Sequence, residues 1–361
     1  MLPPPEREAY LALALIPGIG AARLRHLHQV FRTYRGALSA PFALLRSVES
    51  MATAAATAVA DHDPELVLRV VAAAERLGAR ILTPHDPDFP AQLLAIDDPP
   101  PLLFALGRFE LLERPAVAIV GTRHPTGYGI EATREMAAIA SSLGITVVSG
   151  LARGLDAVAH WAALGQPGST IGVLGNGLGV IYPAANRILY ERVAAEGLLL
   201  TEHPPGERPH AGSFLGRNRL ISGLARATVV VEAPLKSGAL STAEAAAEQS
   251  REVLAVPGMI TSQKSDGTNR LIRDGVAPYL EPEDLLTYYP EAARRWKRRK
   301  SEPELAPRLH SVFGALDGVA RTVDQLAAEL RLNPGQVAGI LTELELAGLA
   351  VAGAGGFQRA P

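Results

Sequence analysis

The segment Thr201–Gly258 reads TEHPPGERPHAGSFLGRNRLISGLARATVVVEAPLKSGALSTAEAAAEQSREVLAVPG. Two short apolar runs, Val229–Glu232 and Val253–Val256, lie on either side of a helical pattern at Thr242–Gln249. Short β-branched strands that alternate with helices are typical of a parallel sheet covered on both faces. The segment therefore predicts a strand–helix–strand unit of an α/β domain.

The same alternation continues toward the N-terminus. Four further runs are expected to be strands, namely Val117–Val120, Ile145–Ser149, Ile171–Leu174 and Leu198–Thr201, with helical patterns at Ile130–Leu143, Asp156–Leu164 and Arg187–Glu196 between them. We therefore predict the α/β fold class, with a Rossmann-like, doubly wound parallel sheet as the core. Two apolar runs in a Pro-rich stretch, Arg80–Thr83 and Leu102–Leu106, are expected to add strands at the edge of the sheet.

The flanking regions differ in pattern from this core. Residues 1–78 are predicted to form an all-helical domain, residues 79–289 the Rossmann-like domain, residues 290–307 a linker and residues 308–361 a winged helix-turn-helix domain. In the first domain, Ile16-Pro-Gly-Ile-Gly20 resembles the turn of a helix-hairpin-helix (SAM-like) element, whose backbone N–H groups can meet a DNA phosphate. A compact helix-packing turn remains the alternative. The run Arg294–Lys300 is interpreted as a solvated linker, although it could touch a polyanion.

The winged helix-turn-helix prediction depends on two helical patterns and a glycine-rich ribbon. Thr322–Leu330 and Gly335–Ala347 are the helices, Asn333 and Pro334 suit the start of the second, and Gly348–Arg359 supplies the ribbon. The second helix has no Lys or Arg and includes Glu343 and Glu345. A groove-reading helix normally needs donors, so protein binding and weak duplex binding remain equal alternatives.

Composition limits the possible functions. The 361 residues have a formal net charge of −2, so nucleic-acid binding would need a local basic patch. There is no cysteine, which excludes disulfides, thiolate catalysis and Cys-type zinc sites and fits a reducing compartment. No signal peptide or membrane-length apolar run is present, and we expect a soluble cytoplasmic protein without membrane contact.

The centre of the quoted segment combines cationic and aromatic side chains. Phe214 is followed by Arg217, Asn218 and Arg219. Arginine pairs offer forked donors suited to phosphate oxygens, and a nearby ring can stack on a base. The alternative is an ordinary helix start, in which Phe214 packs into the core and the arginines are solvated.

Ligands of open α/β sheets bind beyond the carboxyl ends of the strands. Glycines there allow backbone amides to approach a phosphate. The predicted edge presents Gly121, Arg123, Ser149, Gly150, Arg153 and Lys236 beside Phe214, Arg217, Asn218 and Arg219. No Rossmann dinucleotide fingerprint or P-loop is present, and we expect no cofactor. Asp156 and His160 are interpreted as a structural hydrogen-bonding pair rather than a metal site.

The motifs, taken in order, resemble the DNA-processing protein A family (DprA, also called Smf). The resemblance begins near Asp88-Phe-Pro90 and Asp98-Pro-Pro100 and covers at least residues 88–277. The motifs that carry it are Gly121-Thr-Arg123, Ser149–Gly154 with Asp156 and His160, Gly175–Pro183 with Asn186, Phe214–Arg219, Ser237-Gly238, Ala255–Gly258 and Gly267-Thr-Asn269.

The resemblance implies a homodimeric protein without established catalytic activity, which binds single-stranded DNA in natural transformation and recombination and helps load the RecA recombinase. It implies that Arg123, Phe214, Arg217, Asn218 and Arg219 contact DNA, with backbone from Gly121, Ser149 and Gly150. Lys236 is added from its expected place on the rim. The chain departs from the family pattern at Thr122, where Ser is usual, and at Leu215-Gly216, where a Pro is frequent, which leaves loop geometry open.

Two alternatives belong to other functional classes. Ser237–Thr242 with Glu244, together with Glu232, partly resembles Rossmann-like enzymes that hydrolyse nucleoside monophosphates, although their Pro-Gly-Gly turn is missing. A transcription factor that reads duplex DNA through residues 308–361 is the other. Weak duplex binding by the winged helix or the helix-hairpin-helix turn is compatible with the principal interpretation.

Overall fold

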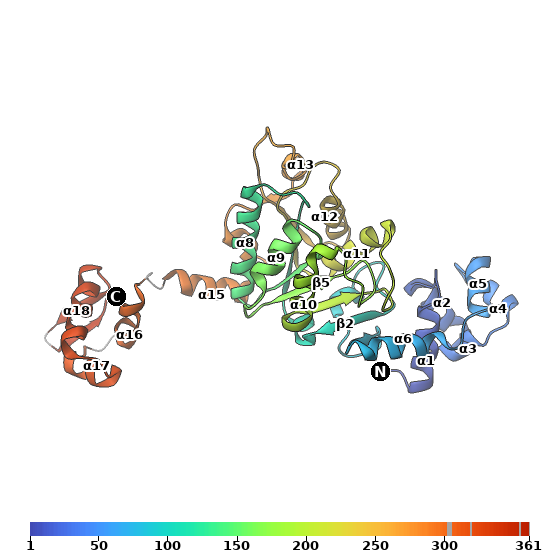
Figure 1. Ribbon diagram of the computed structural model, residues 1–361, viewed down its shortest axis with the longest axis horizontal. Coiled ribbons are helices and arrows are strands. Elements are labelled where there is room, and N and C mark those ends of the chain that lie inside the picture. The colour runs from blue at the N-terminus through green and yellow to red at the C-terminus, as the bar shows by residue number, and fades with distance from the viewer. Residues whose placement is uncertain (302–304, 318–319, 354, 361) are drawn as a thin grey trace. The chain divides into compact units, whose positions relative to one another are not determined.

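The computed structural model describes residues 1–301, 305–317, 320–353 and 355–360 (Figure 1). Two compact units are present, Met1–Arg295 and Trp296–Pro361.

A nine-stranded sheet forms the centre of the first unit in the described part of the chain, with the order β1-β2-β6-β5-β4-β3-β7-β8-β9. The strands from β3 to β9 are parallel, and β1 and β2 add an antiparallel edge beside β6. The predicted core strands and the two edge strands are thus confirmed. Their bounds are β1 Arg80–Leu82, β2 Leu103–Gly107, β3 Ala116–Val120, β4 Thr146–Ser149, β5 Thr170–Val173, β6 Leu198–Thr201, β7 Ala227–Val230, β8 Glu252–Ala255 and β9 Ala277–Pro278.

The strand order reverses at β3. The chain proceeds from β3 through β4 and β5 to β6 on one side, and then returns to place β7 on the other side of β3. Such a reversal separates the loops that follow the two adjacent strands and opens a crevice between them. The loops after β3 and β7 therefore define where a ligand site is expected.

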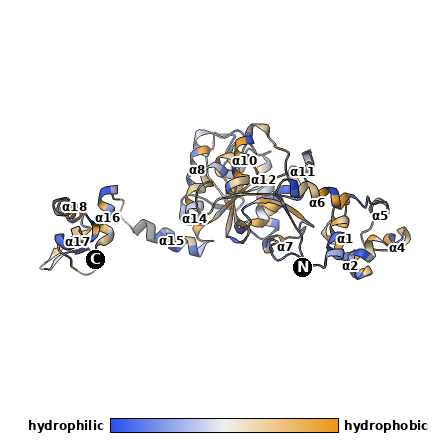
Figure 2. Ribbon diagram, turned by 60° about the horizontal axis from the view of Figure 1, so that its bottom comes forward, coloured by the Kyte–Doolittle hydropathy of each residue, from blue (hydrophilic) through white to orange (hydrophobic). Residues whose placement is uncertain are grey.

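Helices cover both faces of the sheet, and the apolar strands lie between them (Figure 2). Alternate residues of β3, including Ala118 and Val120, pack with Leu220 and Leu224 of α11. Helices α8 and α9 pack together and both contact β3 and β4. The helices and 3₁₀ turns of this region are α7 Ala91–Leu94, η1 Phe109–Glu113, α8 Gly127–Ser142, α9 Leu155–Ala163, η2 Ala184–Asn186, α10 Arg187–Glu196, α11 Ala211–Leu224, α12 Gly238–Glu248, α13 Asp266–Arg273 and α14 Pro282–Leu286.

The N-terminal segment is all-helical, as predicted, and is anchored to the sheet edge. Its helices are α1 Pro4–Ala14, α2 Ala21–Phe31, α3 Tyr34–Leu38, α4 Phe42–Arg46, α5 Thr53–Ala60 and α6 Leu66–Arg76. Arg7 Nη2 donates to Ile81 O at 2.9 Å, and Tyr10 Oη donates to Pro101 O at 2.7 Å. The segment has a buried core of its own, which includes Tyr10, Leu27 and Leu45, and its contacts also join it to the α/β core in one compact unit.

The predicted linker begins as a helix. Helix α15 spans Pro290–Ser301, with Ala292 buried and Arg295 Nη1 donating to Leu143 O at 2.8 Å. A linker was expected from the charge of this segment, but an apolar side chain and a hydrogen bond anchor its first part to the core.

The second unit has the predicted winged-helix elements. These are α16 Pro307–Ala315, α17 Val323–Leu330, α18 Pro334–Leu346, β10 Ala350–Gly353 and β11 Gly356–Arg359. Asn333 caps α18 by accepting from Gly335 N at 2.8 Å, with Pro334 at the first helical position, as the sequence indicated. Phe313, Leu326 and Leu341 are among its buried core residues. Across the described residues of both units, no helix has the length and apolarity required to cross a bilayer.

Candidate nucleic-acid site

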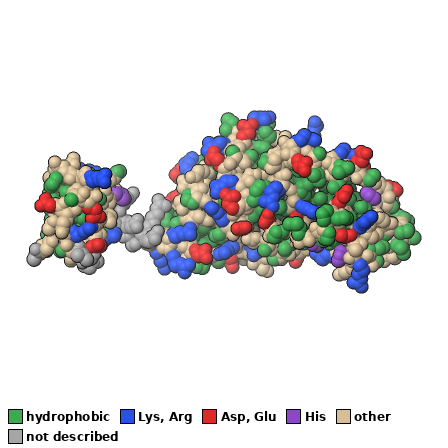
Figure 3. Space-filling model, turned by 90° about the horizontal axis from the view of Figure 1, so that it is seen from below, with side chains coloured by type: hydrophobic (Ala, Val, Ile, Leu, Met, Phe, Trp, Pro, Cys, Tyr) green, Lys and Arg blue, Asp and Glu red, His purple; other side chains and the backbone are tan. Residues whose placement is uncertain are grey.

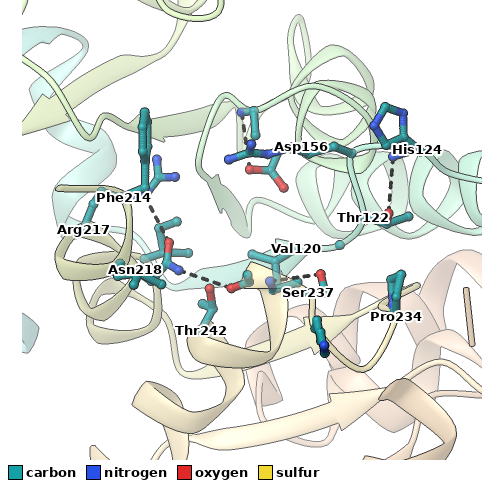
Figure 4. Close-up of a pocket in the computed structure, with 18 of the residues that line it drawn as sticks. Val120, Thr122, His124, Asp156, Phe214, Arg217, Asn218, Pro234, Ser237 and Thr242 are labelled. Atoms are coloured by element: carbon teal, nitrogen blue, oxygen red, sulfur yellow. Dashed lines mark hydrogen bonds between the residues drawn. The ribbon is translucent and has the colours of Figure 1, made fainter. Parts of the chain in front are cut away.

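A cavity of about 490 Å³ opens at the strand-order reversal, between the loops that follow β3 and β7 (Figure 4). We call it the switch-point cavity. Its lining includes Gly121, Arg123, Phe214, Arg217, Asn218 and Lys236 from the predicted site. It also includes His124, Asp156, Thr242 and Lys264. The loops after β3 and β7 thus present Arg123 and Lys236 to the same cavity.

The loop after β3 is held by a buried carboxylate. Thr122 N donates to Glu232 O at 2.7 Å, and Thr126 donates to the Glu232 carboxylate through both its N–H, at 2.9 Å, and its hydroxyl. Thr126 also caps α8. Between these two anchors, Arg123 is exposed, and no hydrogen bond or ion pair with the described residues holds its guanidinium. Its donors are available to a ligand.

Ser149 and Gly150 have structural roles in the loop after β4. Both are buried, and Ser149 Oγ donates to Ile119 O at 2.7 Å. Gly150 N donates to Asp156 Oδ2 at 3.1 Å, while Gly150 O accepts from Arg217 Nη1 at 2.8 Å. The backbone groups of Gly150 expected to face DNA are therefore engaged within the protein.

Asp156 and His160 fix the same loop, as the structural interpretation predicted. His160 Nε2 accepts from Leu151 N at 3.2 Å, and its Nδ1 lies 2.7 Å from Thr170 Oγ1. Burial lowers the pKa of His160 to about 3, with a further contribution from Arg217, so the ring is neutral. Burial also raises the pKa of Asp156, against the opposing effect of Arg217.

Arg217 forms the cationic floor of the cavity. Arg217 is 7% exposed, and its guanidinium donates to the carbonyl oxygens of Gly150 and Val173. Burial lowers its pKa to about 10, and Asp156 offsets part of that shift. Arg217 therefore stays charged at neutral pH while its position is fixed by protein acceptors.

Asn218 and Arg219 have different surroundings despite their adjacency. Asn218 lines the cavity, and its Nδ2 donates to Ser241 Oγ at 2.8 Å. Arg219 instead forms a two-pronged ion pair with Glu202, at 2.5 and 2.7 Å, and another with Asp98 at 3.1 Å. It does not line the switch-point cavity. Arg219 thus ties α11 to neighbouring loops.

Phe214 stands between the switch-point cavity and a second one of about 430 Å³, which we call the side cavity. Its ring centroid lies 5.3 Å from that of Tyr182, with a tilt of 34° between the planes. The side cavity is lined by Arg123, Arg153, Tyr182, Phe214 and Arg217 among others. Arg153 is exposed there without a partner among the described residues.

Sequence reasoning did not assign Tyr182, His124 or Lys264 to the site. The Tyr182-Pro183 pair was visible as a motif, but its approach to Phe214 depends on the loop after β5 meeting α11. Lys264 precedes α13 and lies more than a hundred residues from Arg123 in sequence. No local pattern could indicate that approach.

The arrangement can hold a polyanion that carries flat rings. Exposed Arg123, Arg153 and Lys236 can contact phosphate oxygens, and the Phe214–Tyr182 pair offers ring faces. Asp156 is the one carboxylate among the described residues that line either cavity. Glu232, considered for nucleotide hydrolysis, is buried and committed to the β3 loop, so it does not face a substrate.

Comparison with known proteins gives a consistent family match. Residues 80–290 match the family model described as DNA recombination-mediator protein A, and residues 297–356 match a DprA winged helix domain. The chain is 36% identical to Protein Smf of Synechocystis sp., over 95% of this chain and 96% of that protein. It is 39% identical to a putative DNA processing protein DprA of Mycobacterium tuberculosis, over 76% of this chain and 75% of that protein.

Two solved structures are similar as well. DNA processing protein A from Streptococcus pneumoniae superposes with a TM-score of 0.68 at 30% identity, covering 80% of this chain and 98% of that one. A Helicobacter pylori DNA processing protein A, described by its "unique single-stranded DNA binding mode", gives a TM-score of 0.54 at 33% identity, covering 58% of this chain and 94% of that one.

Proposed function

The chain belongs to the DNA recombination-mediator protein A family, and on that premise we propose that its switch-point and side cavities bind single-stranded DNA in natural transformation and recombination. The proposal is supported by the single-stranded DNA binding described for the Helicobacter pylori relative. The observation that carries it is the meeting of exposed cations and an aromatic pair around Phe214.

The cationic side chains would contribute in different ways according to their exposure. Arg123, Arg153 and Lys236 are exposed and would pair with phosphate oxygens. Arg217 is already bonded to two carbonyl groups, so its contribution is a fixed positive potential beneath the strand and a stable loop geometry. Asn218 would orient α12 through Ser241 more than it would touch DNA.

Base contact would be made by stacking. Phe214 and Tyr182 present neighbouring rings between two cavities that share Arg123 and Arg217, which suits successive nucleotides with a phosphate between them. Stacking tolerates any base, so the expected affinity is largely independent of sequence and falls as salt increases. Duplex DNA conceals its ring faces and should bind more weakly.

The wider role follows from the family premise. We propose that the protein acts in the cytoplasm as a homodimer, protects incoming strands and helps load RecA on them. Two linked sites would raise the affinity for long strands by increasing the local concentration of the second site. The family membership supports these assignments.

The terminal regions are proposed to contribute weak duplex binding at most. In the Ile16–Gly20 turn, the guanidinium of Arg23 is engaged by Gly18 O, while Arg25 of α2 is exposed. In α18, Glu343 pairs with Arg308 at 2.9 Å, and the helix contains no Lys or Arg. Helix α18 thus lacks unpaired cations of the kind that surround Phe214, namely Arg123, Arg153 and Lys236.

A competition titration tests the proposal directly. The full chain is bound to a fluorescent oligothymidine, and unlabelled single-stranded or duplex DNA of equal length is added. We expect the single strand to compete at a concentration at least about tenfold lower, a difference of 1.4 kcal/mol. Equal competition would contradict a stacking site. Release of free base from nucleoside monophosphates would instead favour the hydrolase alternative.

A further inference from the structure

A separate group of arginines lies at the opposite edge of the sheet, where the strands begin. Arg114 precedes β3, Arg226 precedes β7, and Arg295 lies on α15, which starts near the end of α8 (Figure 1). The three side chains line a cavity of about 360 Å³ that we call the amino-edge cavity. It shares no lining residue with the switch-point or side cavity.

Of the three arginines, Arg226 has the fewest contacts with protein acceptors. It is exposed, and its guanidinium lies 5.9 Å from the ring centroid of Tyr289 without a hydrogen bond to the described residues. The ring itself is fixed, because Tyr289 Oη donates to Ala116 O at 2.7 Å and accepts from Ala227 N at 3.2 Å. A rigid surface therefore supports the guanidinium while its donors stay available.

Arg114 and Arg295 are each positioned by one nitrogen. Arg114 Nη1 donates to Pro167 O, and Arg295 Nη1 donates to Leu143 O at 2.8 Å, at the end of α8. An arginine has five N–H donors, so each retains donors that no described residue accepts. Glu291 is the one carboxylate in the lining, and it forms no ion pair with these arginines.

We propose that the amino-edge cavity binds a phosphate group, carried either by a polynucleotide strand or by a small nucleotide. Two guanidinium groups positioned by hydrogen bonds and a third with free donors, opposed by one carboxylate, suit a phosphate, whose oxygens accept paired N–H donors. Pro115, Ile145 and Pro167 give the cavity an apolar part that can cover a sugar or a base. On the face in Figure 3 the cations are interspersed with carboxylates, whereas the amino-edge cavity gathers three arginines with one carboxylate.

The site is independent of the proposed single-strand site. A ligand there would contact α15 through Arg295, and therefore the helix that leads out of the first unit. Occupancy of the amino-edge cavity would stabilise the packing of that helix against the end of α8.

The test uses the full chain and three single charge reversals. Arg226→Glu alters the amino-edge cavity, Arg123→Glu alters the switch-point cavity, and Arg134→Glu changes an exposed arginine of α8 that lines none of the three. Calorimetric titration with pyrophosphate and with thymidine monophosphate measures small ligands. Fluorescence anisotropy with strands of six and thirty thymidines measures DNA.

We expect Arg226→Glu to weaken at least one probe by about tenfold relative to Arg134→Glu, as for the loss of a charged hydrogen bond. Weakening of both small ligands assigns the site to a free nucleotide, and weakening of the long strand alone assigns it to DNA. Arg226→Lys, which keeps the charge, should retain most of the binding. The proposal is overturned if Arg226→Glu and the uncharged Arg226→Gln match Arg134→Glu with every probe.

Discussion

The carboxyl edge of the sheet and the winged-helix unit differ in how they place charge. At the sheet edge, Arg123, Arg153 and Lys236 come from three loops and remain exposed around Phe214. In the winged-helix unit, α18 occupies the place of a groove-reading helix, yet it includes Glu343 and Glu345 and no cation. A familiar motif does not bring a nucleic-acid surface with it. In this chain of net charge −2, local geometry decides where an anion can bind.

The largest effect is expected from Arg217, the buried arginine of the switch-point cavity. Arg217→Ala should lower the free energy of unfolding by about 3 kcal/mol, because two buried carbonyl groups lose a charged donor and Asp156 loses its nearby cation. Urea denaturation followed by circular dichroism measures the change. Arg123→Ala is the matched control, and equal stability of the two variants would contradict the structural role of Arg217.

The aromatic pair gives the next test. Phe214→Ala should weaken single-strand binding by about 2 kcal/mol, roughly thirtyfold, through the loss of base stacking. Anisotropy with an oligothymidine measures the affinity. Phe214→Trp should bind nearly as well as the parent, and Trp161→Ala should have no effect because that exposed ring lines neither cavity. A stacking role is untenable if Phe214→Ala behaves like Trp161→Ala.

The contribution of the exposed Arg123 to single-strand affinity should depend on the salt concentration. Arg123→Ala is expected to reduce single-strand affinity about tenfold and the slope of log affinity against log salt by about one. Titrations between about 50 and about 200 mM salt provide both numbers. Arg134→Ala removes the same charge elsewhere and should leave the slope unchanged. A parental slope for Arg123→Ala would remove Arg123 from the phosphate contacts.

Acid should destabilise the first unit through the protonation of His160. Its pKa of about 3 in the folded protein lies below the ordinary value of 6.5, so the unfolded chain binds the proton first. The contribution of His160 to the free energy of unfolding is therefore fully present above about pH 6.5. It decreases as pH falls toward 3, by about 1 kcal/mol between pH 7 and 5.5. The raised pKa of Asp156 acts in the opposite direction, because protonation of this carboxylate removes the cost of burying its charge.

Urea denaturation of parent and His160→Gln at pH 7 and 5.5 isolates this contribution. The variant should lose less stability on acidification than the parent does. Identical losses for parent and variant would rule out His160 as the source.

The smallest effect is expected from the winged-helix unit. A chain that ends at Ser301 retains α15 and every residue of the three cavities. Its single-strand affinity should stay within about twofold of the full chain, because electrostatic affinity follows the number of phosphates neutralised. Anisotropy with the same oligothymidine decides the question, and a tenfold loss would place DNA contacts in the removed unit.

Much of the fold was accessible from local patterns. Strands β1 to β8 were predicted within about two residues because their apolar runs differ from the intervening helical patterns, whereas the two-residue strand β9 was not predicted. The Asn333-Pro334 start of α18 was equally local, since a cap depends on adjacent residues. The helix over Pro290–Ser301 was not predicted, because its anchor to Leu143 joins residues far apart in the sequence.

The sequence by itself determined the sheet, its glycine-rich carboxyl edge and the presence of arginines near Phe214. Only the tertiary structure decided which arginines could meet a ligand. Arg217 and Arg219 are two positions apart on α11, and a helix turns by about 200° over two residues, so they face opposite directions. One was buried against Gly150 and Val173, the other was paired with Glu202, and Arg123 remained exposed. A side chain's partners come from distant segments, and folding alone brings those segments together.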